Sequence, residues 1–199
     1  MRVRMMALCF VLGASSVAAT AQMAMGGQSA AAAGTMVAPS KAIDSELSLI
    51  EGEMMGAVKA MPAEKFSFAP SAAIFAPGQT TEFATVRTFA QQAAHVAQAN
   101  YFFYMTVAGT KPDVDVAGIA KLTKRDDVIA ALAGSFAFAH KAIATITEAN
   151  AFEVVKIPEP GIQTRATLAQ FGVSHAFDHY GQMVEYLRMN GIVPPASAK

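Results

Sequence analysis

The residues of this chain best suited to chemistry are two histidines four positions apart, His175 and His179. They lie in a long segment whose apolar residues recur every three or four positions, the period of an amphipathic helix. Side chains at positions i and i+4 lie on one face of a helix, so both imidazoles could reach a single metal ion. Leu168, Phe171 and Tyr186 share this face, which indicates that both histidines point into the protein interior.

A shared metal ion is one of two explanations for this pair. A single histidine on an apolar face is more often a core residue than a ligand, but two buried imidazoles without partners are costly. A third ligand would have to come from another helix. His95 and His140 are both expected to face inward, and helical periodicity does not choose between them.

The residues around the pair exclude several familiar sites. The spacing is H-x-x-x-H, but Ala176 stands where zinc proteases with an H-E-x-x-H motif carry their catalytic glutamate. The sequence has no C-x-x-C-H haem motif, no paired E-x-x-H of di-iron bundles, no phosphate-binding Walker A loop and no G-x-S-x-G elbow. Any metal site must therefore be built from histidines and their polar neighbours.

Two polar residues near the pair are candidates for supporting such a site. Asp178 lies near the edge of the histidine face and could orient an imidazole N–H, or it could be a solvated surface carboxylate. Gln182 lies on the histidine face itself. Further candidates for contacts with the histidines or with a substrate are Gln91, Gln98 and Tyr180.

Four helices are predicted to position these residues. Their expected extents are from an N-cap at Ser40 to Met61, about 85–107, from an N-cap at Thr123 through Thr147, and about 164–190. Two long connections separate them: residues 62–84, with three prolines, and residues 151–163, with two prolines and a short β-prone run. Residues 111–118 are expected to form a loop. The pattern predicts an all-α fold, a four-helix bundle with long crossover connections.

The N-terminus has the features of a signal peptide. Arg2 and Arg4 precede an apolar stretch, and Ala19-Thr20-Ala21 fits a signal peptidase site. The stretch is shorter than the ~20 residues of a membrane span. We therefore expect residues 1–21 to be removed and the protein to be periplasmic or secreted. Residues 22–39, rich in Ala, Gly, Ser and Met, are predicted to be a flexible linker before a domain at 40–196.

Composition narrows the function further. Lys and Arg together number 15, as do Asp and Glu. The chain therefore lacks the excess of positive charge that attracts nucleic acids. Cleavage would remove the only cysteine, Cys9, and leave a mature chain without thiolate ligands. No later segment is apolar enough to be an integral membrane span.

Three separated segments resemble the DinB/YfiT-like family of metalloenzymes. They are Met-Pro-Ala-Glu-Lys-Phe-Ser-Phe at 61–68; Thr88-Phe89 with His95-Val96-Ala97 and Asn-Tyr-Phe-Phe at 100–103; and His-Ala-Phe-Asp-His-Tyr-Gly-Gln at 175–182 followed by 186–195. The segments occur in the family's order, and the resemblance covers roughly residues 40–196.

The resemblance implies a four-helix bundle that binds one divalent metal ion, commonly zinc or nickel, through three histidines. Carried onto this sequence, the ligands are His95, His175 and His179. His140 matches no ligand of the family, which implies a core residue or a neighbour that supports the ligands. Relatives include thiol-dependent transferases and hydrolases, but low-molecular-weight thiols are scarce outside the cytoplasm, which argues against a thiol transferase here.

Two functions from different classes are compatible with such a site. Three neutral imidazoles leave one or two positions of the ion open, as a metal-dependent hydrolase or group-transfer enzyme acting on a small molecule requires. The alternative is a non-catalytic exported binding module with a structural metal. The three-ligand set favours the enzyme, whereas the absence of a securely placed carboxylate base favours the module. Exposed apolar helix faces would be consistent with a homodimer.

Overall fold

The structure is a computed structural model that describes residues 31–83, 85–157, 161 and 163–198. The predicted signal peptide, residues 1–21, and the first half of the predicted linker, residues 22–30, lie outside the described residues. All described helices belong to one compact unit, Ala33–Lys199.

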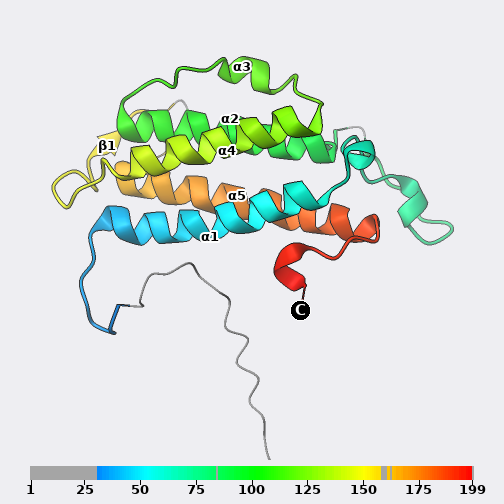
Figure 1. The fold of residues 1–199 in the computed structure, drawn as a ribbon, viewed down its shortest axis with the longest axis horizontal. Helices are drawn as coiled ribbons and strands as arrows, with labels where there is room; N and C mark the ends of the chain where they lie inside the picture. Colours follow the sequence, from blue (N-terminus) through cyan, green and yellow to red (C-terminus); the bar gives the residue numbers. More distant parts are fainter. Residues whose placement is uncertain (1–30, 84, 158–160, 162, 199) are drawn as a thin grey trace, which may run out of the picture. The chain divides into compact units, whose positions relative to one another are not determined.

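Four long helices form the unit (Figure 1). They are α1 (Pro39–Ala60), α2 (Phe89–Ala108), α4 (Arg125–Ile143) and α5 (Arg165–Met189). Helix α2 packs against α4 and α5, and α1 packs against the same two helices. The helices that follow one another across the two long connections, α1 with α2 and α4 with α5, therefore lie diagonally. This arrangement confirms the predicted all-α bundle and explains why both connections must be long.

The core of the bundle is built from the predicted apolar stripes. On α1 the buried members are Ile43, Leu47, Ile50, Met54, Ala57 and Val58. On α4 they include Leu132, Phe136 and Ile143, whereas Ile129 on the same face is only partly buried. Each stripe recurs at three or four positions, so each helix buries one face against its two neighbours.

Capping residues set the helix ends. Thr88 closes a capping box with Gln91 at the start of α2, and Thr164 does the same with Thr167 at the start of α5. The expected N-cap at Ser40 is wrong by two residues: Ala38 is the cap and Pro39 occupies the first turn, where its missing N–H has no consequence. The N-cap of α4 is Lys124 rather than Thr123, a difference of one residue.

The connections contain short ordered elements. The first carries the 3₁₀ turns η1 (Ala63–Lys65) and η2 (Ala72–Ile74) and is tied to α2, since Phe89 N donates to Phe68 O at 2.8 Å. The second contains the antiparallel pair β1 (Val154–Val155) and β2 (Gln163–Thr164), as the β-prone run predicted.

The loop expected at 111–118 is partly wrong, because the short helix α3 (Val116–Ile119) begins within it. The Asp115 side chain caps this turn by accepting from Gly118 N at 3.0 Å. Helix α3 lies along the outer side of α2 (Figure 1). A third 3₁₀ turn, η3 (Pro195–Ser197), packs against α1 at the end of the domain.

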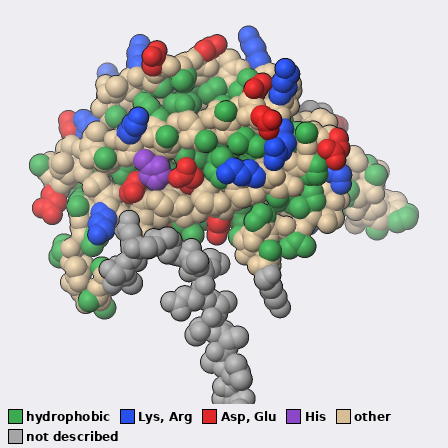
Figure 2. Space-filling model, in the orientation of Figure 1, with side chains coloured by type: hydrophobic (Ala, Val, Ile, Leu, Met, Phe, Trp, Pro, Cys, Tyr) green, Lys and Arg blue, Asp and Glu red, His purple; other side chains and the backbone are tan. Residues whose placement is uncertain are grey.

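The surface mixes charges of both signs. On the face shown in Figure 2, acidic and basic side chains lie interspersed among apolar ones, in agreement with the balanced composition. Among the described helices, none is both long and apolar enough to cross a lipid bilayer.

Candidate metal centre

The antiparallel packing of α2 on α5 decides which residues meet. At one end the Tyr186 hydroxyl donates to Arg87 O at 3.0 Å, and near the other the Tyr104 hydroxyl donates to Ala169 O at 3.0 Å. A step of one turn along α2 is therefore matched by a step of one turn back along α5. His95, midway along α2, comes to lie opposite the histidine pair of α5.

The three histidines form a compact group. The ring centroids of His95 lie 5.2 Å from those of His175 and 4.8 Å from those of His179, and the last two rings are 4.5 Å apart. Each imidazole offers one nitrogen, and these three atoms lie within 4.8 Å of one another. The structure thus brings together the three residues that the resemblance named as ligands.

The closest nitrogens have the spacing that a shared ion requires. Nε2 of His175 and Nε2 of His179 are 3.2 Å apart. Two imidazoles bound to one tetrahedral zinc ion, with Zn–N bonds of about 2.0–2.1 Å, place their nitrogens about 3.3 Å apart. The pair could therefore bind one ion without rearrangement of the helix that carries it.

A chain of hydrogen-bonded polar side chains leads away from His179. Its Nδ1 lies 2.6 Å from Oε1 of Gln92, and Nε2 of Gln92 donates to Oε1 of Gln182 at 2.8 Å. Nε2 of Gln182 in turn donates to Oδ2 of Asp178 at 3.1 Å. The two candidates from the sequence, Asp178 and Gln182, are therefore linked to the site, but Asp178 does not bond to an imidazole directly.

Sequence reasoning missed Gln92, the residue that actually bonds to a histidine. It is buried, and it lies three residues before His95 on the same face of α2, which is the signal that could have identified it. Two other candidates have structural roles instead. Gln91 completes the capping box of α2, and Nε2 of Gln98 donates to Val116 O at 2.9 Å and so anchors α3.

One family model matches the chain, that of the DinB superfamily, over residues 46–183. This is more than half of the sequence. The chain belongs to the DinB superfamily. The matched part begins in α1 and ends in α5, and it contains all three histidines together with Gln92, Asp178 and Gln182. None of the curated proteins compared with the chain matches it.

The three clustered imidazoles of this DinB domain are held in the neutral form. Burial, the charge of Arg87 and the proximity of His175 lower the pKa of His95 to about 4. Burial and the other two histidines lower the pKa of His179 to about 4. Burial also lowers the pKa of His175, although the charge of Asp178 opposes the shift. Neutral imidazole is the form that binds a metal, so no proton has to be displaced at neutral pH.

The contact between the two Nε2 atoms is also suited to a cation. Between two neutral rings it can hold a single proton, which one ring must donate to the lone pair of the other. An ion at this place would accept both lone pairs. Among the described residues, the buried Nδ1 of His175 has no hydrogen-bond partner, so only Nε2 of that ring takes part in a hydrogen bond.

Aromatic side chains form one wall of the site. The ring of Phe103 meets His175 edge-on with centroids 5.5 Å apart, and Phe171 packs against Phe103 at 5.2 Å. Phe171 is 44% exposed, so this wall reaches solvent. The site therefore has an apolar side, formed by these two rings, and a positive side, where the charge of Arg87 acts on all three histidines.

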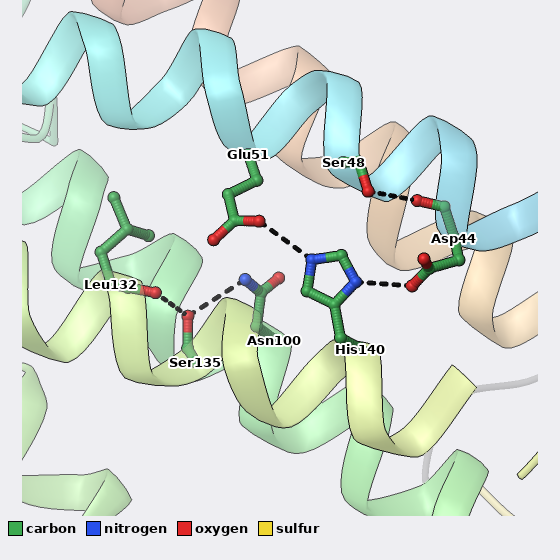
Figure 3. A network of polar contacts seen from close by, with 7 residues as sticks. All are labelled: Asp44, Ser48, Glu51, Asn100, Leu132, Ser135 and His140. Carbon is green, nitrogen blue, oxygen red and sulfur yellow. Dashed lines mark hydrogen bonds and ion pairs between the residues drawn. The ribbon is translucent and has the colours of Figure 1, made fainter. Parts of the chain in front are cut away.

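His140 lies apart from this group. It extends from α4 to α1, where its Nδ1 is 2.5 Å from Asp44 Oδ1 and its Nε2 is 2.9 Å from Glu51 Oε2 (Figure 3). The expectation of a core residue or a neighbour of the ligands is wrong, because the side chain is 29% exposed and both ring nitrogens face carboxylates. The two carboxylates lie on opposite edges of the ring, so the three groups do not converge on one point.

Proposed function

We propose that this DinB superfamily protein binds one divalent metal ion through His95, His175 and His179. The proposal rests on one observation above all: three nitrogens from two helices lie within 4.8 Å of one another. Zinc and nickel are the expected ions, because imidazole ligands suit both and because the mature chain would contain no thiolate. The neutral state of the rings supports the same conclusion.

We further propose that the site is catalytic, in a metal-dependent hydrolase or group-transfer enzyme with a small-molecule substrate. The group of possible ligands found among the described residues has three members, whereas structural zinc sites usually have four. When bound, the ion would act as a Lewis acid that polarises a substrate and activates a nucleophile. The protein's own contribution is to hold the imidazoles, to line one side of the site with the apolar rings of Phe103 and Phe171, and to present the charge of Arg87.

The second candidate function is a non-catalytic module with a structural metal. It is favoured by the side chains beside the ligands, since Gln92 and Gln182 are neutral amides and the Asp178 carboxylate is bonded to Gln182. Among the described residues, the hydrogen bonds of the imidazoles of the group join them to Gln92 and to each other, not to a carboxylate. In either case we propose that the protein acts outside the cytoplasm, after removal of residues 1–21.

Metal content is the first test. Wild-type protein and the single variants His95→Ala, His175→Ala and His179→Ala would be purified and analysed by elemental mass spectrometry. We expect about one equivalent of metal in the wild type and a large loss in each variant. His140→Gln is the matched control, because it removes a histidine of the same bundle that faces carboxylates instead. Equal metal content in all four histidine variants and the wild type would refute the site.

A chelator separates the two candidate functions. Metal-free protein that retains its helical circular dichroism but loses turnover of ester, amide or thiol-transfer substrates supports the enzyme. Unfolding on metal removal supports the structural module, because a structural zinc contributes directly to folding. Activity that is unaffected by the chelator would count against a metal-dependent enzyme.

A further inference from the structure

The chain of hydrogen bonds from Asp178 to His179 has a fixed order of donors and acceptors. Four side chains are joined by three contacts: Asp178 to Gln182 at 3.1 Å, Gln182 to Gln92 at 2.8 Å, and Gln92 to His179 at 2.6 Å. The two ends differ in environment. Asp178 is exposed at the surface of α5, whereas Gln92 and His179 are buried between α2 and α5.

The glutamines alone could be joined in either direction. Each side-chain amide has a carbonyl that accepts and an NH₂ group that donates, and the two groups have nearly the same shape. A neutral imidazole is also reversible, because either nitrogen can carry the proton. The donor-to-acceptor order of the whole chain is therefore set by the one residue that can only accept.

Asp178 is that member. A carboxylate can only accept hydrogen bonds, so the NH₂ group of Gln182 must face it. The carbonyl of Gln182 then faces Gln92, whose NH₂ group donates to it and whose own carbonyl faces Nδ1 of His179. An acceptor at this position requires a proton on Nδ1, which leaves the lone pair of His179 on Nε2. The opposite order would place two acceptors, the carboxylate and the Gln182 carbonyl, in contact.

We infer that Asp178 is a positioning residue that sets the tautomer of His179 through Gln182 and Gln92. The effect of this tautomer on metal affinity rests on the proposed function. Nε2 of His179 faces Nε2 of His175 across 3.2 Å, so its lone pair is the one that would bind the shared ion. Both glutamines are needed for the effect. The carboxylate and the imidazole occupy adjacent positions of α5 but are not hydrogen-bonded to each other, and the hydrogen-bonded path between them passes through Gln92 of α2.

The burial of Gln92 gives the surface residue this influence. Gln92 is only 2% exposed. If its amide were reversed, water could not readily reach it to form the missing hydrogen bonds. Gln182 is exposed, and without a carboxylate beside it water could satisfy its amide in either orientation. Besides its direct charge effect on His179, the surface carboxylate thus acts on the buried ring through the orientation of two amides.

The experiment is carried out first on metal-free protein. Nitrogen-15 NMR of the imidazole rings at pH 8 distinguishes a protonated Nδ1 from a protonated Nε2. We expect His179 of the wild type to be protonated at Nδ1 alone. In Asp178→Asn the new amide can donate or accept, so the direction is no longer specified and we expect signals of both tautomers. Asp113→Asn, the same change at an exposed loop residue, is the matched control and should resemble the wild type.

A second substitution gives a rescue. Gln92→Glu places an acceptor-only group directly against Nδ1, so the Asp178→Asn, Gln92→Glu double variant should return to the single tautomer. Zinc competition with a chelator should show an affinity loss of about twofold in Asp178→Asn when the two tautomers are equally populated, because only one of them presents the Nε2 lone pair. Recovery of affinity in the double variant would support the inference.

The two proposals can fail separately. Unaltered Nδ1 protonation of His179 in Asp178→Asn would overturn the inference, whatever the metal affinity. Loss of the single tautomer in this variant, in a protein that binds no metal in any form, would support the inference and refute the proposed metal site.

Discussion

The imidazole of His140 on α4 is bonded to the carboxylate of Asp44 on α1, with 2.5 Å between Nδ1 and Oδ1. On the opposite edge of the ring, Nε2 lies 2.9 Å from Oε2 of Glu51 (Figure 3). Only an imidazolium can donate at both nitrogens. Burial by itself would lower the pKa of His140, but the hydrogen bonds to Asp44 and Glu51 and the charges of these groups raise it above its usual value of 6.5.

The first prediction follows from this shift. A histidine whose pKa is higher in the folded than in the unfolded state adds stability below pH 6.5, and this stability is lost as the pH rises through the folded pKa. We expect wild type to exceed His140→Gln in free energy of unfolding by about 1 kcal/mol at pH 5, a value in keeping with partly exposed pairs, and by less at pH 9. Urea unfolding at both pH values measures the difference, and a pH-independent gap would contradict the prediction.

The charge of Arg87 gives the second prediction. It helps to lower the pKa of His95, His175 and His179, because a nearby cation disfavours imidazolium. Arg87→Met retains much of the side-chain length and removes the charge. We expect the pKa of all three histidines to rise in metal-free protein titrated by NMR. His140 is the internal control, since the charge of Arg87 is not among the causes of its shift, and a rise confined to His140 would disprove the account.

Close approach of α2 and α5 gives the third prediction. A Cβ atom at Gly172 would lie 2.8 Å from the hydroxyl oxygen of Tyr104, a fully buried side chain. We expect Gly172→Ala to reduce stability by about 1–3 kcal/mol, as overpacking does, and to weaken zinc binding because it forces apart the helices that carry the ligands. Gly181→Ala on the same helix is the control.

At Gly181 the added Cβ would have no neighbour within 4 Å. Alanine is a better helix former than glycine by up to ~1 kcal/mol, so this variant should be at least as stable as the wild type. Denaturant unfolding and chelator competition would be measured on both variants. Equal stability for the two would show that the contact with Tyr104 is not tight.

The fourth prediction concerns metal affinity and pH. A proton competes with a metal for an imidazole only near or below the pKa of that imidazole. Because His95 and His179 have pKa values of about 4, we expect the apparent Kd for zinc to rise by less than about tenfold between pH 7.5 and pH 5.5. Three histidines with the usual pKa of 6.5 would lose about a thousandfold over this range. A loss of that size would contradict the burial of the ligands.

Local sequence was enough to predict the four long helices of this protein. Amphipathic stripes such as Ile43, Leu47 and Ile50 place the four helices, because a helix that buries one face needs apolar residues every three or four positions. The same rule put His175 and His179 on one buried face. Helix ends were predicted within a few residues, because caps such as Thr164 and left-handed glycines such as Gly191 act on their immediate neighbours.

Only the tertiary structure decided which buried faces meet. Periodicity states that His95 and His140 face inward but not toward which helix, and the two remained equivalent until the resemblance favoured His95. The register of α2 on α5 places His95 against the pair, whereas the rotation of α4 turns His140 toward Asp44 and Glu51 of α1. Gln92 was missed for the same reason. Its role depends on a partner 87 residues away, and contacts over such distances arise from packing between helices rather than from the pattern within one.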